Sequence, residues 1–135
     1  MTRPERQQTL EELEGKTWGP PSYPSHLVQT CHALRCKPIG TFTVEDLRIM
    51  IGQKMGLPHL IPVALDLLEQ DPLAEGDFFP GDLLQNVALA TEFLQHHPTL
   101  KARALEVARR ALADARLRLP EVRRALETFT HQVDM

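Results

Sequence analysis

The sequence predicts an all-α, single-domain bundle of about six or seven helices. Apolar residues recur three or four positions apart in nearly every segment that shows periodicity. No segment of useful length alternates apolar and polar residues, as a half-buried β-strand would. At 135 residues the chain has the common size of one domain, and it can bury a core without disulfides or a metal.

The first two expected helices begin at hydroxyl residues that can accept from unpaired backbone amides. Ser25 can cap a helix that stops before Lys37. Its inward residues are Leu27, Val28, Cys31 and Leu34. The segment Thr43–Asp46 has the form of a capping box, because the Thr43 hydroxyl can accept from the Asp46 amide while the Asp46 carboxylate reaches back. Gly56 can end this second helix in the left-handed conformation.

The segment Leu57–Gln70 is apolar over most of its circumference as a helix, which predicts a central, buried position. Pro58 suits the first turn, where its missing amide would have no partner in any case. Pro62 lies deeper and removes one amide donor, so we expect a distorted start to this helix.

Three more helices complete the expected bundle. Asp82 can cap the first, which runs to the His96–His97 pair, where imidazolium groups favour the negative end of the helix dipole. Thr99 can cap the second, whose inward stripe is rich in alanine and permits close packing. Pro120 opens the last helix. Residues 1–8 are polar, so we expect a frayed terminus and one helical domain over residues 9–135.

Charge is distributed unevenly along the chain, whose net charge is −3. Residues 1–97 carry thirteen acidic and seven basic side chains, whereas residues 98–135 carry five acidic and eight basic. The two segments can attract each other or present faces of opposite sign. The arginines of the basic segment could bind phosphate backbones, remain a solvated helix face, or lie against the acidic half of the same molecule. These arginines include Arg103, Arg109, Arg110 and Arg116.

The sequence indicates a cytoplasmic location. No apolar stretch follows the start MTRPERQQ, so no signal peptide is expected, and no run approaches the roughly 20 apolar residues that span a bilayer. Cys31 and Cys36 suit free thiols in a reducing compartment. On one helix these cysteines and the nearby histidines point in different directions, which disfavours a zinc site.

The segment Asp71–Leu84, DPLAEGDFFPGDLL, gathers four carboxylates around two phenylalanines. A calcium loop needs oxygen ligands at alternating positions, and Leu73 and the aromatic pair interrupt that pattern. Asp77 and Asp82 could do acid–base work, but nothing in the sequence indicates a raised pKa. We therefore expect no catalytic residue, metal or cofactor, and the simpler role is a solvated acidic loop followed by a helix cap.

Several blocks of the chain resemble one of the small helical families of bacterial contact-dependent growth inhibition (CDI) immunity proteins. The matching blocks are LEELE followed by WG at Trp18 and Gly19, then SHLVQTCHALR, FTVEDLRIMIGQ, GLPHLIPVAL and PLAEGDFFPGDLL. The resemblance covers residues 9–97 in order, whereas residues 98–135 fit the family less well and form a more variable basic tail.

The resemblance implies a non-enzymatic protein that binds and neutralises the cognate C-terminal toxin domain of a contact-delivered effector. These toxins are often nucleases, whose active sites are basic because they hold phosphates. An acidic inhibitor surface can steer toward such a site and block it, with aromatic residues as anchors. We expect that surface to comprise Asp66, Glu69, Asp71, Glu75, Asp77, Phe78, Phe79 and Asp82.

Other interpretations stay open at this point. Both phenylalanines could pack in the core, and the acidic segment would then be a structural corner. The chain could also be a helical adaptor unrelated to toxins, or a nucleic-acid binder that uses the basic C-terminal helices. We expect neither a membrane nor a nucleic acid as a direct partner, and the sequence does not fix the oligomeric state.

Overall fold

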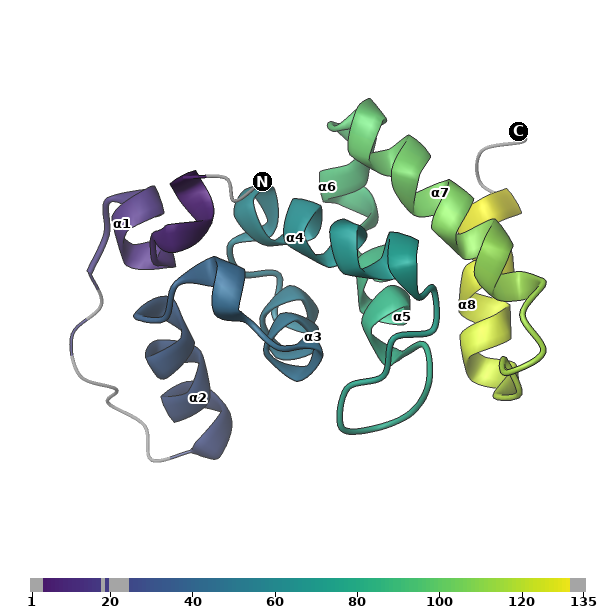
Figure 1. The fold of residues 1–135 in the computed structure, drawn as a ribbon, viewed down its shortest axis with the longest axis horizontal. Coiled ribbons are helices and arrows are strands. Elements are labelled where there is room, and N and C mark those ends of the chain that lie inside the picture. Colours follow the sequence, from purple (N-terminus) through teal and green to yellow (C-terminus); the bar gives the residue numbers. More distant parts are fainter. Residues whose placement is uncertain (1–3, 18, 20–24, 132–135) are drawn as a thin grey trace.

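The computed structural model describes residues 4–17, 19 and 25–131, and these form an all-α domain. Eight α-helices and two 3-10 helices lie within the described residues, where the predicted fold class is confirmed (Figure 1). In chain order the elements are η1 (Pro4–Gln7), α1 (Leu10–Glu14), α2 (His26–Arg35), η2 (Ile39–Thr41), α3 (Val44–Gly52), α4 (Leu57–Gln70), α5 (Asp82–Leu89), α6 (Thr91–Gln95), α7 (Pro98–Leu112) and α8 (Pro120–His131).

Capping at the start of α2 and α3 follows the sequence prediction. The Ser25 hydroxyl accepts from the Val28 amide at 3.1 Å. The Thr43 hydroxyl accepts from the Asp46 amide at 3.1 Å, and the Asp46 carboxylate accepts from the Thr43 amide at 3.0 Å. Each bond satisfies an amide that the first helical turn leaves unpaired.

Three predicted helix boundaries, one at a C-terminus and two at N-termini, are wrong in position. Gly56 is left-handed, with φ 62°, but it precedes α4 and does not end α3. Gly81, with φ 89°, occupies the cap position of α5, so Asp82 is the first helical residue and does not cap the helix. His97 precedes α7, and Thr99 lies inside its first turn. Pro98 explains this last shift, because its fixed φ suits the first position of a helix.

The single helix expected before the histidine pair is two helices, α5 and α6, which meet at Ala90. The histidines do cap the end of α6, as predicted. His96 Nδ1 lies 2.9 Å from the Glu92 carbonyl oxygen, and His97 Nδ1 lies 2.8 Å from that of Phe93. Both rings thus bond carbonyls of the last turn of α6, although that of Phe93 also accepts from the His96 amide at 3.1 Å.

Helix α4 lies at the centre of the bundle and packs against α3, α5 and α7 (Figure 1). Its fully buried residues are Leu60, Ile61, Ala64, Leu65 and Leu68. The predicted central helix is therefore confirmed, and it continues through Pro62. Helices α7 and α8 pack against each other at one end of the molecule, and α1 and α2 lie at the other.

Arginines of the C-terminal segment bind the acidic half of the same chain. Arg103 on α7 donates to Asp66 at 2.8 Å and to Glu69 at 2.9 and 2.7 Å, both on α4. Arg110 donates to the Glu69 carbonyl oxygen at 2.9 Å. Of the alternatives that the sequence left open, these contacts favour intramolecular attraction over a free basic face.

Asp66 also holds the N-terminal turn, because Arg6 in η1 lies 2.6 Å from its carboxylate. Of residues 1–8, for which the sequence suggested a frayed terminus, residues 4–7 form η1 and residues 1–3 lie outside the described residues. Burial raises the pKa of Asp66, but hydrogen bonds and positive charge from Arg103 and Arg6 outweigh it, so the pKa is below its usual value.

Replacing Arg103 with methionine is expected to lower the free energy of unfolding by about 1 kcal/mol, because two partly exposed carboxylates lose their shared cation. Methionine keeps the apolar stem, so packing is largely retained. Urea denaturation followed by circular dichroism measures the change. Arg109→Met is the matched control on the same helix: Arg109 is exposed, lies 3.9 Å from Glu106, and should cost about 0.5 kcal/mol or less. Equal losses in the two variants would contradict the prediction.

Candidate functional site

Residues 71–82 form the acidic loop, a connection between α4 and the start of α5 that projects from the body of the bundle (Figure 1). One isolated antiparallel bridge pairs Glu75 with Pro80 across the loop. At its base the Gly81 amide donates to the Leu73 carbonyl oxygen at 3.2 Å. These backbone contacts make the loop a compact turn.

The carboxylate of Asp82 organises this turn from inside. Its side chain is buried, with the residue only 2% exposed. It accepts from the amides of Gly76 at 2.7 Å, Phe78 at 3.1 Å and Phe79 at 3.3 Å. A buried carboxylate is tolerated when several donors replace its lost hydration, and three backbone amides do so here. Asp82 therefore shapes the surface of the loop without being part of that surface.

Helix α3 supports the loop from the other side through Glu45 and Arg48. Arg48 donates from Nε and Nη2 to the two oxygens of Glu45, at 2.6 and 2.5 Å. The Glu45 carboxylate also accepts from the Asp77 amide at 2.9 Å. The hydrogen bond from Arg48 lowers the pKa of Glu45 below its ordinary value. Glu45 thus remains ionised and available to hold the loop backbone.

This contact places carboxylate oxygens close to the backbone at Gly76. A Cβ atom added to Gly76 would lie 2.6 Å from Glu45 Oε1 and 3.1 Å from Asp82 Oδ2. The two carboxylates approach the loop backbone so closely that any side chain there would displace one of them. The sequence does not indicate the role of Glu45 and Arg48, since their separation of three residues predicts a pair on one helix face but not what that pair would hold.

The two adjacent phenylalanines have different environments. Phe79 is partly buried and packs against the hydrophobic core. Phe78 is 67% exposed, and its ring centroid lies 4.0 Å from the guanidinium carbon of Arg48. That distance is within the range of a cation–π contact. The rival interpretation of two core phenylalanines therefore holds for Phe79 and is wrong for Phe78.

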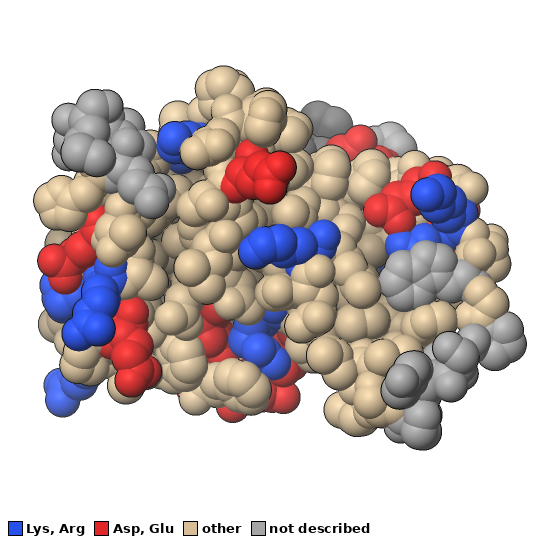
Figure 2. Space-filling view, turned by 180° about the vertical axis from the view of Figure 1, so that it is seen from behind, with Lys and Arg blue, Asp and Glu red and all other residues tan. Residues whose placement is uncertain are grey.

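Apart from the buried Asp82, the carboxylates predicted for the surface separate into two groups. Asp66 and Glu69 bind Arg103, and Asp71 lies 2.7 Å from Arg116 Nη2. The exposed carboxylates of Glu75 and Asp77 make no ion pair in the part of the chain that the structure describes. With Phe78 they form the loop tip, and this name is used below for Glu75, Asp77 and Phe78. On the face shown in Figure 2, acidic and basic side chains mostly lie next to each other in small mixed groups.

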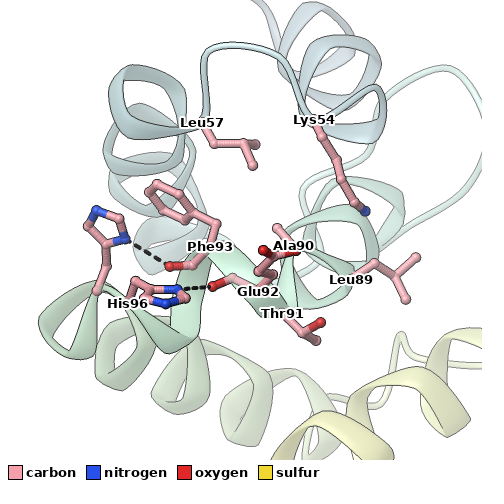
Figure 3. Close-up of a pocket in the computed structure, with 9 residues that line it drawn as sticks. Lys54, Leu57, Leu89, Ala90, Thr91, Glu92, Phe93 and His96 are labelled. Atoms are coloured by element: carbon pink, nitrogen blue, oxygen red, sulfur yellow. Dashed lines mark hydrogen bonds between the residues drawn. The ribbon is translucent and has the colours of Figure 1, made fainter.

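A second candidate is a hollow of about 580 Å³ at the junction of α5 and α6 (Figure 3). It is lined by Lys54, Leu57, Leu89, Ala90, Thr91, Glu92, Phe93, His96 and His97. The two histidines have structural roles, because their Nδ1 atoms bond the carbonyls that end α6, and the His97 ring stacks on Phe93 with centroids 4.0 Å apart. The two histidines in the lining of the hollow are therefore engaged in the fold and do not form a pair of free imidazoles.

Within the described ranges, no group of three or more His, Cys, Asp or Glu residues could hold a metal ion. No helix among these residues is long and apolar enough to cross a bilayer. Cys31 is buried, and the Cys36 thiol donates to Glu11 at 3.2 Å.

Comparison with known proteins identifies one family. The family model described as CDI immunity proteins matches residues 12–104, a range that contains α3, α4 and the whole acidic loop. This range agrees with the resemblance over residues 9–97, although Trp18 lies outside the described residues. No curated protein and no solved structure matches the chain.

Proposed function

Because the chain belongs to the family of CDI immunity proteins, we propose that it neutralises a nuclease toxin by closing that toxin's active site. Membership of the family gives the chain an immunity role against a CDI toxin. The proposal adds the kind of toxin, the surface that binds it and the mode of inhibition. The partner is the C-terminal toxin domain of the cognate effector, and binding takes place in the cytoplasm.

The main support for this proposal is the exposure and charge of the loop tip. Glu75 and Asp77 are exposed carboxylates next to an exposed aromatic ring, on a backbone that Asp82 and Glu45 hold in place. A nuclease active site concentrates positive charge where it binds phosphates. An acidic projection is complementary to such a site in charge, which speeds encounter and favours the correct orientation.

Inhibition by binding requires no chemistry from the immunity protein. Asp66, Glu69 and Asp71 hold arginines of the same chain, and Asp82 holds backbone amides. These carboxylates act as acceptors of hydrogen bonds in the fold. Glu75 and Asp77 project from the loop, and the described contacts place no base or nucleophile beside them. This arrangement suits recognition better than catalysis.

Coexpression with the toxin domain encoded beside this gene tests the immunity role, and we expect growth to be restored. With purified proteins, cleavage of a nucleic-acid substrate should fall as the immunity protein approaches equimolar amounts. Raising the substrate concentration should weaken the inhibition, because substrate and inhibitor compete for one site. Continued growth arrest would contradict protection from this toxin, and inhibition that is independent of substrate concentration would contradict active-site closure.

A further inference from the structure

We infer that Phe78 is the anchor of the interface and that Arg48 positions its ring for insertion into an apolar pocket of the toxin, a pocket rimmed by basic side chains. This inference rests on the proposed function and names the chemistry of the partner surface. It also separates the role of the ring from that of the carboxylates beside it.

The exposure of Phe78 requires an explanation, because the adjacent residue, Phe79, packs its side chain against the core. Phe78 is the most exposed of the four exposed large hydrophobic residues in the described ranges, the others being Leu27, Leu89 and Leu119. The exposed part of the phenyl ring gives no burial free energy to the free protein. It yields that free energy only when a partner covers it.

The ring is held in place before any partner arrives. The backbone amide of Phe78 donates to Asp82 Oδ2 at 3.1 Å, which fixes the backbone at this residue. The face of the ring lies on the Arg48 guanidinium, which Glu45 holds through two hydrogen bonds and which lies 3.9 Å from Asp82. A side chain with two rotatable bonds that is already ordered loses little entropy on binding. These are the properties of a residue that dominates the stability of an interface.

The charges around the ring define its pocket. Glu75 and Asp77 precede Phe78 by three and one positions in the chain, and both are exposed. When the ring enters a pocket, these carboxylates meet its rim, where only basic or neutral polar groups avoid repulsion. A wholly apolar partner surface would desolvate both carboxylates and supply no counter-charge of its own. The complementary surface is therefore an apolar pocket with a basic rim.

The inference predicts how each rate constant changes in surface plasmon resonance against the immobilised toxin domain. Phe78→Ala should raise the dissociation rate constant about 30-fold, as for other buried aromatic anchors, and change the association rate constant less than about twofold. Leu89→Ala is the matched control, since Leu89 is 53% exposed but lies at the other end of α5. It should leave both constants within about twofold of wild type.

A double-mutant cycle tests the role of Arg48 as a positioning residue. Arg48→Met should raise the dissociation rate constant about fivefold in the wild-type background and less than about twofold in the Phe78→Ala background, because most of its effect passes through the ring and only the remainder through Glu45, which holds the Asp77 amide. Additive effects would overturn the positioning role. An unchanged dissociation rate in Phe78→Ala would overturn the anchor even if charge reversal at Glu75 and Asp77 still weakened binding. Failure of the wild-type protein to bind any toxin domain would instead overturn the proposed function itself.

Discussion

Replacing Asp82 with alanine is expected to lower the free energy of unfolding by about 3 kcal/mol, the largest effect on stability foreseen for the acidic loop. The substitution removes one buried carboxylate and leaves the amides of Gly76, Phe78 and Phe79 without their acceptor. Each amide then remains partly buried and unpaired or draws water into the loop. Urea denaturation followed by circular dichroism gives the difference in free energy.

Two further variants make this prediction specific. Asp82→Asn keeps the shape and one acceptor oxygen, so its loss should be intermediate, at about 1–2 kcal/mol. Asp77→Ala removes an exposed carboxylate from the same loop and should cost about 0.5 kcal/mol or less. A loss in Asp82→Ala no greater than that in Asp77→Ala would show that the buried carboxylate does not hold the loop.

Reversing both charges of the loop tip, by Glu75→Lys together with Asp77→Lys, is expected to weaken toxin binding about 100-fold. Two attractive carboxylates become two cations that face a basic surface, so encounter slows and the close complex contains repulsion. Most of the loss should appear in the association rate constant, and it should shrink as salt is raised. Kinetics measured at several ionic strengths separate these contributions.

The control for charge reversal carries the same change in net charge at a different place. Glu121→Lys together with Glu127→Lys alters two exposed carboxylates on α8 and should reduce affinity less than about threefold at physiological salt. An equal loss in the two double variants would mean that net charge, and not the loop tip, governs binding. Asp82→Lys is unsuitable for this comparison, because it would place a cation in a buried position and disrupt the loop.

Local sequence patterns predicted much of the fold. The caps at Ser25 and Thr43 and the histidines that end α6 each depend on atoms within four residues of one another, so their patterns are visible in the sequence. The attraction between acidic and basic halves was one of several possibilities. Arg103 binds Glu69 on α4, and Arg116 binds Asp71 at the end of α4. These contacts favour attraction within the molecule over the other possibilities.

The organisation of the loop could not be read from the sequence in the same way. Glu45 binds the amide of Asp77, 32 residues away, and only the packing of α3 against α5 brings them together. Asp82 was expected at the cap of α5, but the left-handed Gly81 takes that position, and the carboxylate turns back toward the loop. Equally, nothing in the pair Phe78–Phe79 indicates which ring the core receives.

The manner in which the acidic loop is held separates folding from recognition. Asp82 and Glu45 bind main-chain amides of residues 76–79, so the support does not depend on the side chains at positions 75, 77 and 78. Those three positions can change in shape or charge while the backbone that presents them keeps its course. With the loop tip as the proposed toxin-binding surface, a lineage facing a new toxin could therefore exchange these three residues by single substitutions, without first having to rebuild the domain that carries them.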